Sequence, residues 1–166
     1  MPNVEIPSPS ISRSDAPEFN LKSIYEEEMT SKDLKGKMVI INFCTTWTPA
    51  CARELPELHK LQDKLKKKNV QFVAISLDEG GQKEVEPVFG KMKLNFPVLI
   101  GSYELIKEFG GIDVIPTTFI IEPDWKLVNR YTGQVDPKML EAEIRFRIKD
   151  YNRRMKELAK LQATKQ

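Results

Sequence analysis

Apolar residues gather in short runs that polar segments separate. Residues 38–43 (MVIINF) are apolar except for Asn42, and residues 70–77 (VQFVAISL) form a second run. Continuous apolar runs of this length are typical of strands that are covered on both faces of a sheet. Residues 96–100 (FPVLI) predict a third strand. The pattern therefore predicts a central sheet buried inside the protein.

Helical periodicity follows the first of these strands. Thr48 and Pro49 predict the start of a helix, because Thr can cap free backbone N–H groups and Pro tolerates the first helical position. The apolar positions of this helix recur at spacings of three and four and give it one buried face: Ala52, Leu55, Leu58, Leu61 and Leu65. Shorter helices are predicted over residues 82–93 and 104–109. Strands and helices thus alternate along the chain, as in an α/β fold.

The C-terminal half adds an antiparallel pair of strands over residues 117–121 and 127–131. A long helix is predicted to begin at Asp136, with Pro137 in its first turn. A short edge strand is predicted within residues 17–24. The predicted fold is therefore a central mixed β-sheet flanked by helices, with an N-terminal strand extension and a long C-terminal helix.

The predicted organisation has three parts. Residues 1–16 are rich in Pro and Ser and predict a tether, residues 17–150 form the domain, and residues 151–166 are a C-terminal helical extension. Apolar residues keep heptad spacing from Ile144 to Leu158. Two hypotheses follow for the extension. It is either a helix packed on its own domain with a frayed end, or a docking helix for a second copy or another partner.

Composition narrows the classes of function. The formal net charge is +2 although 30% of the residues are charged, so the surface is balanced and nucleic acid is not an indicated partner. No apolar run approaches the ~18 residues needed to cross a bilayer, and the first residues lack the pattern of a signal peptide. Two cysteines and one histidine do not make a tetrahedral metal site, so neither a metal nor a cofactor is predicted.

Both cysteines lie in the segment FCTTWTPAC, residues 43–51. Cys51 falls in the first turn of the predicted helix, where the positive end of the helix dipole stabilises a thiolate. Glu54 lies three residues further on the same face, within reach of acting as proton acceptor for Cys51. A buried, unreactive Cys51 is the alternative, since free cysteine behaves as a small hydrophobe.

Several motifs occur in an order that resembles the thioredoxin superfamily, and specifically its TlpA/ResA-like branch of extracytoplasmic thiol–disulfide oxidoreductases. The segments that carry the resemblance are APEFNL (residues 16–21), LKGK (34–37), VIINF (39–43), WTPAC followed by RELP (47–51 and 53–56), and IPTTFII (115–121). The resemblance implies a thioredoxin-like fold and thiol–disulfide exchange with a protein that bears thiols or a disulfide. It also implies a bacterial protein that acts outside the cytoplasm, tethered through a segment upstream of Met1.

The resemblance assigns roles position by position. The exposed nucleophilic cysteine of the family falls on Thr48, and its buried partner falls on Cys51. Its active-site glutamate falls on Glu54 and its cis-proline on Pro116, whereas Cys44 stands where the family usually has an aromatic residue. The substrate-binding positions that the resemblance implies are Trp47, Pro49, Ile115, Pro116 and Thr117.

The threonine at position 48 leaves four hypotheses open. Cys44 and Cys51 form a relocated redox pair; or the chain is a redox-inactive thioredoxin-fold binding module. Alternatively, it is a peroxiredoxin-like peroxidase with Cys51 as the peroxidatic cysteine; or Thr48 replaces a natural cysteine of an ordinary dithiol oxidoreductase. Sequence does not supply the Cα separation of roughly 4.4–6.8 Å and the Cβ directions that a Cys44–Cys51 disulfide requires.

Overall fold

The computed structural model describes residues 13–165, and within this range the chain forms one six-stranded sheet and one two-stranded sheet. The order of strands in the large sheet is β1-β8-β7-β4-β5-β6. Its strands are β1 (Ser14–Asp15), β4 (Met38–Cys44), β5 (Val70–Ser76), β6 (Val98–Ile100), β7 (Thr117–Ile121) and β8 (Lys126–Thr132). β4, β5 and β6 run parallel, while β7 pairs antiparallel with both β4 and β8. The predicted mixed sheet is confirmed.

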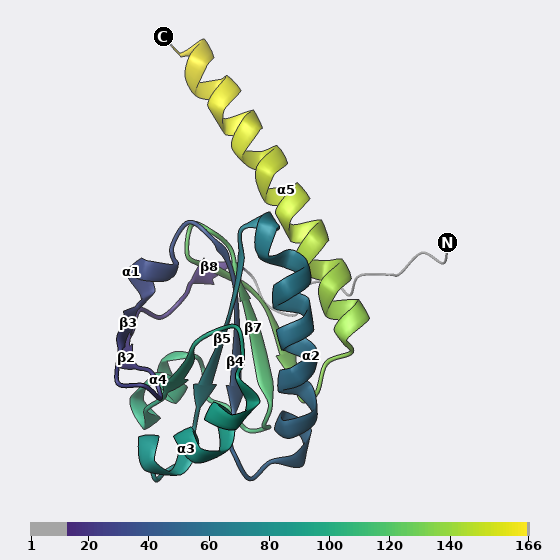
Figure 1. Cartoon of the computed structure of the whole chain (residues 1–166). Coiled ribbons are helices and arrows are strands. Elements are labelled where there is room, and N and C mark those ends of the chain that lie inside the picture. Colours follow the sequence, from purple (N-terminus) through teal and green to yellow (C-terminus); the bar gives the residue numbers. More distant parts are fainter. Residues whose placement is uncertain (1–12, 166) are drawn as a thin grey trace.

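Helices cover both faces of this sheet (Figure 1). The helices are α1 (Ser31–Leu34), α2 (Pro49–Leu65), α3 (Gln82–Phe89), α4 (Tyr103–Glu108) and α5 (Pro137–Thr164), with short 3-10 turns η1 (Lys66–Lys68) and η2 (Gly90–Met92). One apolar cluster joins residues of α2, α3 and α5 to one face of the sheet, and a second joins α1 and α4 to the other face. The fold is therefore a layered α/β domain.

β4 is the central strand of the fold, and every one of its residues is buried. Alternation along the strand places Ile40 and Cys44 in the cluster below α2, and Ile41 and Phe43 in the cluster below α4. The apolar run therefore reflects burial on both faces, as predicted. Asn42 is the polar exception, and it lies on the face of the strand that carries Cys44.

The N-terminal segment differs from the prediction. Residues 1–12 of the predicted tether lie outside the described residues, but Ser14 and Asp15 pair with Leu127 and Lys126 of β8. Ala16 is buried, so residues 14–16 pack against the part of the chain that was predicted to form the domain. Backbone pairing with an edge strand explains why a segment without apolar periodicity is ordered.

The predicted edge strand over residues 17–24 is shorter and pairs elsewhere. Only β2 (Asn20–Lys22) forms, and it pairs with β3 (Glu28–Thr30) in the small sheet. Ser23 makes a single bridge to Leu99 of β6. The polar segment after residue 25 thus contains the strand β3 and the short helix α1.

The turn between β7 and β8 is built around Trp125, which adopts a positive φ of 64° and is 4% exposed. Its Nε1 donates to the carbonyl of Pro17 at 3.2 Å, and its ring packs on that of Phe19 at a centroid distance of 6.1 Å. Trp125 therefore anchors the N-terminal segment against the sheet.

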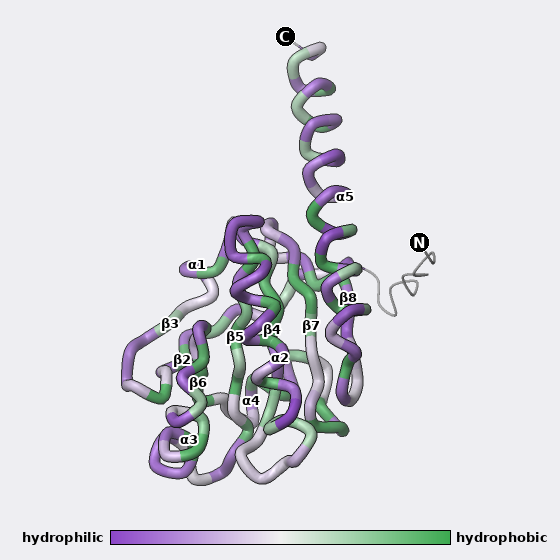
Figure 2. The backbone as a smooth tube through the Cα atoms, turned by 45° about the vertical axis from the view of Figure 1, so that its right-hand side comes forward, coloured by the Kyte–Doolittle hydropathy of each residue, from purple (hydrophilic) through white to green (hydrophobic). Residues whose placement is uncertain are grey.

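The long C-terminal helix begins as predicted, because the side chain of Asp136 accepts hydrogen bonds from the backbone N–H groups of Lys138 and Met139. α5 packs on α2 through Leu140 and Ile144 and then continues away from the domain (Figures 1 and 2). Arg154 still binds the buried Glu122, so the helix remains attached beyond the predicted boundary at residue 150. Among residues 13–165, no helix is both long and apolar enough to cross a membrane.

Candidate redox site

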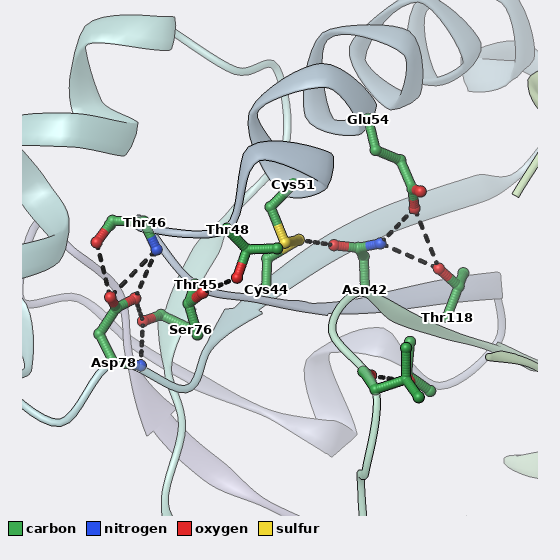
Figure 3. Close-up of a disulfide and its surroundings, with 12 residues drawn as sticks. Asn42, Cys44, Thr45, Thr46, Thr48, Cys51, Glu54, Ser76, Asp78 and Thr118 are labelled. Carbon is green, nitrogen blue, oxygen red and sulfur yellow. Dashed lines mark hydrogen bonds between the residues drawn. A yellow bond between two sulfur atoms is a disulfide. The ribbon is translucent and has the colours of Figure 1, made fainter. Parts of the chain in front are cut away.

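A disulfide joins Cys44, the last residue of β4, to Cys51 in the first turn of α2 (Figure 3). Their Cα atoms lie 5.7 Å apart, within the range of protein disulfides. Cys44 lies at the carboxyl end of β4, and the first turn of the following helix, α2, places Cys51 beside it. This separation is the quantity that the sequence could not supply.

Neither cysteine reaches the surface, since both are 0% exposed. The segment that joins β4 to α2 connects the two cysteines and places Trp47 outside with 69% exposure, while Thr48 is half-buried. A reacting thiol from a substrate therefore cannot reach either sulfur in this conformation.

Thr48 occupies the cap position of α2, but its side chain makes no capping hydrogen bond, which corrects the predicted capping role. Its hydroxyl oxygen instead lies 2.5 Å from that of Thr45. The backbone carbonyl of Thr48 accepts from the N–H groups of Cys51 and Ala52 at 3.1 and 3.3 Å. The threonine hydroxyl thus ties the two ends of the connecting segment together.

Asn42 contacts the disulfide from inside the protein. Its Oδ1 lies 2.7 Å from Cys44 Sγ, and its Nδ2 donates to Glu54 Oε1 at 2.8 Å and to Thr118 Oγ1 at 3.0 Å. A disulfide sulfur carries no proton, so in the oxidised protein the first of these is a contact. After reduction, the Cys44 thiol can donate its proton to the same oxygen.

Glu54 lies in the interior with 1% exposure. Burial raises the pKa of its carboxyl, and the hydrogen bonds that it accepts from the backbone N–H of Val135, at 3.2 Å, and from Thr118 and Asn42 oppose that rise. The sequence predicted Glu54 as the proton acceptor for Cys51. The hydrogen bonds described here connect it instead to the Cys44 side of the disulfide, through Asn42.

Asp78 is a part of the site that the sequence analysis missed. Both of its carboxylate oxygens accept from the backbone N–H of Thr46 at 3.1 Å, and Oδ1 also accepts from Thr46 Oγ1 at 2.7 Å. Ser76 Oγ donates to the other oxygen at 2.6 Å. A signal for Asp78 existed in the sequence, because parallel strands end at one edge of a sheet and polar residues just beyond neighbouring strands meet there.

The segment around Pro116 reaches the same edge of the sheet. Phe43 of β4 is in register with Thr117 of β7, and the Ile115–Pro116 peptide bond is cis. Thr117 Oγ1 donates to the carbonyl of Val114 at 2.6 Å, and Ile115 packs against the cluster that contains both cysteines. The chain thus brings the segment from Ile115 to Thr117 to the edge of the sheet where β4 ends at Cys44.

The fold and the site define a thioredoxin-like protein of the thiol–disulfide oxidoreductase class. The AhpC/TSA family matches residues 13–130, and the chain belongs to this family. It is 33% identical over 131 residues to the thiol–disulfide oxidoreductase ResA of Bacillus anthracis, which covers 79% of this chain and 75% of that protein. ResA of Bacillus subtilis (strain 168) is 32% identical over 127 residues, covering 76% and 70%.

Solved structures are similar over most of the chain. A thiol:disulfide interchange protein of the thioredoxin family from Chlorobium tepidum TLS superposes with a TM-score of 0.74 at 26% identity, covering 84% of this chain and 99% of that one. StoA from Bacillus subtilis gives a TM-score of 0.65 at 29% identity, covering 76% and 95%. The predicted resemblance to ResA-like proteins is confirmed, and the Cys44–Cys51 disulfide is consistent with redox exchange in a chain that has threonine at position 48.

Proposed function

We propose that this chain exchanges thiols and disulfides with a protein partner through the Cys44–Cys51 pair, in place of a pair at positions 48 and 51. The observation that carries the proposal is the disulfide itself, at the edge of the sheet where β4 and α2 meet. The partner is a protein that bears a dithiol or a disulfide. No metal or cofactor takes part, because thiol chemistry alone moves the electrons.

The exchange moves two electrons. Toward a dithiol partner, a partner thiolate attacks one sulfur of the disulfide, a mixed disulfide forms and the other cysteine leaves as a thiolate. The second partner thiol then releases its proton and displaces the first cysteine, so both cysteines end reduced and the partner ends oxidised. The reverse sequence reduces a partner disulfide.

The surroundings assign different roles to the two cysteines in the reduced state. Cys51 lies at the N-terminal end of α2, where the helix dipole favours its thiolate. Cys44 lies beside Asn42 Oδ1, which accepts a hydrogen bond from the thiol and thereby favours the protonated form. Cys51 is therefore the attacking thiolate toward a partner disulfide, and Cys44 resolves the mixed disulfide after losing its proton to water.

Trp47 and Pro49 form the exposed part of the proposed partner-binding surface, and the segment from Ile115 to Thr117 adds the half-buried Ile115, whereas Pro116 and Thr117 are buried. This placement is supported by the exposure of Trp47 beside the disulfide and by the register that brings Thr117 next to Phe43. Thr48 lies between Trp47 and Pro49 in the chain and takes no electrons. Glu54 acts from the interior on the pKa of the cysteine thiols.

Two further parts of the proposal concern location and assembly. By similarity to ResA-like proteins, the chain works outside the cytoplasm and is held at a membrane by a segment upstream of Met1. The exposure of Leu158 and Leu161, at 49% and 59%, supports self-association through the end of α5. Either part can fail without affecting the exchange reaction.

The test is to alkylate the denatured protein with and without prior reduction in the native state, and to weigh it. We expect alkyl groups on both cysteines only after native-state reduction, and exchange with a model protein disulfide that Cys44→Ser and Cys51→Ser each abolish. The complete burial of both sulfurs favours one alternative, a redox-inactive binding module. Resistance to every reductant until the protein unfolds would support that module and exclude the redox proposal.

The peroxidase hypothesis fits the site less well. A peroxidatic cysteine needs an accessible thiolate to attack the peroxide, whereas Cys51 is buried and bonded to Cys44. Loss of a stoichiometric amount of hydrogen peroxide upon mixing with the reduced protein, at the rate of an activated cysteine, would reverse this preference.

A further inference from the structure

We infer that Asp78 is a latch on the segment that covers the disulfide, and that its hydrogen bonds to Thr46 set the rate at which the Cys44–Cys51 pair becomes accessible. This inference rests on the proposed function, because it concerns access to the same sulfurs. It adds a positioning residue that acts through the covering segment and does not itself touch the reacting atoms.

Exchange at this site requires an opening step. Nucleophilic attack needs a sulfur that the incoming group can reach, and both sulfurs are 0% exposed. β4 is paired on both sides and α2 is packed along its length, so neither can move without disrupting the core. We therefore take the segment that connects β4 to α2, residues 45–48, as the part that moves, and call it the covering segment. Its motion therefore controls access to the disulfide.

The carboxylate of Asp78 connects this segment to the rest of the fold through hydrogen bonds. It accepts the backbone N–H of Thr46 with both oxygens and the hydroxyl of the same residue with one. Hydrogen bonds to an ionised carboxylate are about twice as strong as those between neutral groups. Asp78 is only 6% exposed, so water competes weakly for these bonds.

The latch is fixed on its other side to β5. Ser76 is the last residue of that strand, and it is in register with Cys44 of β4. Its hydroxyl donates to Asp78, and the backbone N–H of Asp78 donates back to the same hydroxyl oxygen at 3.1 Å. Figure 3 shows the resulting chain from Ser76 through Asp78 to Thr46, beside the disulfide. The carboxylate thus holds the segment to a strand that does not move.

The remainder of the segment is held less firmly. Thr45, 1% exposed, is buried next to Cys44, but Trp47 is 69% exposed and contributes little burial, and the hydroxyl contact between Thr45 and Thr48 lies within the segment. Breaking the bonds between Thr46 and Asp78 is therefore the main step in exposing the sulfurs. A partner that binds Trp47 is placed to favour this opening.

Opening before attack has a distinct kinetic signature. The closed segment protects the oxidised pair and the reduced pair alike, so weakening the latch speeds reduction and reoxidation by the same factor. The equilibrium between the disulfide and the two thiols then stays unchanged. A residue that tunes the thiols themselves shifts that equilibrium instead.

The experiment compares Asp78→Asn and Thr46→Val with the wild-type protein. Thr46→Val removes the hydroxyl bond and keeps the backbone bond, so it tests the latch even where Asp78→Asn folds poorly. Reduction is followed with a trialkylphosphine, which gives two electrons to the disulfide and becomes the phosphine oxide with an oxygen from water. Reoxidation is followed with oxidised dithiothreitol, which accepts two electrons and becomes the dithiol.

We expect both rates to rise on the order of tenfold in Asp78→Asn and a few-fold in Thr46→Val. The equilibrium constant with dithiothreitol should stay at the wild-type value. Glu79→Gln is the matched control, because Glu79 is the exposed neighbour of the latch. Trp125→Phe controls for a general loss of stability at a site remote from the disulfide.

Unchanged rates in both latch variants would overturn the inference, as would an equal rise in Glu79→Gln or Trp125→Phe. A shift in the equilibrium constant without a change in rates would also overturn it. The proposed function fails separately, if the wild-type disulfide resists the phosphine until the protein unfolds. In that case, a disulfide that reacts only in Asp78→Asn upholds the latch, and one that reacts in no variant excludes both.

Discussion

The carboxylate of Glu54 and the sulfur of Cys44 contact opposite ends of the same side-chain amide, that of Asn42. Glu54 is 1% exposed and Cys44 is 0% exposed, so water screens little of the interaction between them. The charge on the carboxyl therefore acts on the redox pair although the two groups share no hydrogen bond.

The first prediction concerns stability and pH in the oxidised protein. Burial raises the pKa of Glu54 in the folded state, so the folded protein retains a proton that the unfolded chain has released. The stability linked to this proton is fully present below the ordinary pKa of Glu and is lost as pH rises through the raised value. We expect the free energy of unfolding of Glu54→Gln, relative to that of wild type, to increase as the pH rises. The measurement is urea denaturation of both proteins between pH 4 and 8.

Glu54→Gln also loses a hydrogen bond, because an amide nitrogen in place of Oε2 cannot accept from the N–H of Val135. At low pH we therefore expect the variant to be less stable by about 1–2 kcal/mol. Glu57→Gln, one turn along α2 and partly exposed, is the matched control and should follow the wild-type curve. Parallel curves for wild type and Glu54→Gln would contradict a raised pKa.

The second prediction concerns the reduced protein. An ionised Glu54 disfavours a thiolate on the neighbouring Cys44, because two negative charges close together in a poorly screened interior repel each other. Replacing the carboxylate with an amide should move the pH profile of thiol alkylation to lower pH. The measurement is the alkylation rate of Glu54→Gln, wild type and Glu57→Gln across pH 6–10. An unshifted profile would mean that Asn42 does not transmit the charge.

These relationships show what the sequence could and could not predict. The buried strands could be predicted from the sequence because a strand buried on both faces is apolar at nearly every position. Residues such as Ile40 and Ile41 belong to such continuous apolar runs. The start of α5 could also be predicted, because Asp136 and Pro137 are residues that typically begin a helix. The features that could be predicted were therefore those that depend on residues close together in the chain.

The contacts of the site depend on residues far apart in the chain. Asp78 meets Thr46 across 32 positions, and Thr118 meets Asn42 across 76. The spacing of Cys44 and Cys51 permits a disulfide but does not require one, since the bend between β4 and α2 fixes their distance. The sequence could single out candidates such as Cys44 and Cys51, whereas Asp78 and the connections between these residues followed only from the packed fold.

The third prediction concerns Trp125, which has no counterpart in the predicted site. Trp125→Ala should lower the free energy of unfolding by about 3–5 kcal/mol, because a buried aromatic ring and its bond to Pro17 are lost. Trp125→Gly should be less damaging by about 1 kcal/mol, because glycine adopts the positive φ of this turn without a steric penalty. The reverse order of the two variants would show that backbone conformation is not limiting here.

The comparison has an internal control. Trp47 is 69% exposed, so Trp47→Ala should change stability by less than about 0.5 kcal/mol. Chemical denaturation followed by circular dichroism avoids the loss of the fluorescence signal that any tryptophan substitution causes. A large effect of Trp47→Ala would mean that the covering segment contributes to the stability of the whole fold.

The fourth prediction locates the end of the part of α5 that stabilises the domain. Arg154 pairs with Glu122, which is 1% exposed and also binds Arg13. A chain that ends at residue 152 loses one of the two partners of a buried carboxylate and should be less stable by about 1–3 kcal/mol. A chain that ends at residue 156 should stay within about 0.5 kcal/mol of wild type. Equal stability of the two truncations would contradict this assignment.

The same truncation tests self-association. Leu158 and Leu161 are exposed, and the chain ending at residue 156 removes both while keeping Arg154. If the end of α5 joins two copies, the mass in solution should fall to that of a monomer on truncation. A full-length chain that is already monomeric at high concentration would exclude this role for the helix.

The fifth prediction concerns a cysteine introduced at position 48, which is less buried than Cys44 and Cys51. Position 48 is half-buried at the cap of α2, whereas Cys44 and Cys51 are fully buried. Thr48→Cys should therefore reduce a protein disulfide several-fold faster than wild type, because attack no longer waits for the covering segment to open. Thr48→Ser is the matched control, since it keeps a hydroxyl and adds no sulfur. The gain should persist when Cys44→Ala is added, because the new cysteine can then pair with Cys51. If Thr48→Cys reacts no faster than Thr48→Ser, burial of the sulfurs does not limit exchange, and the limit lies in the reactivity of the cysteines themselves.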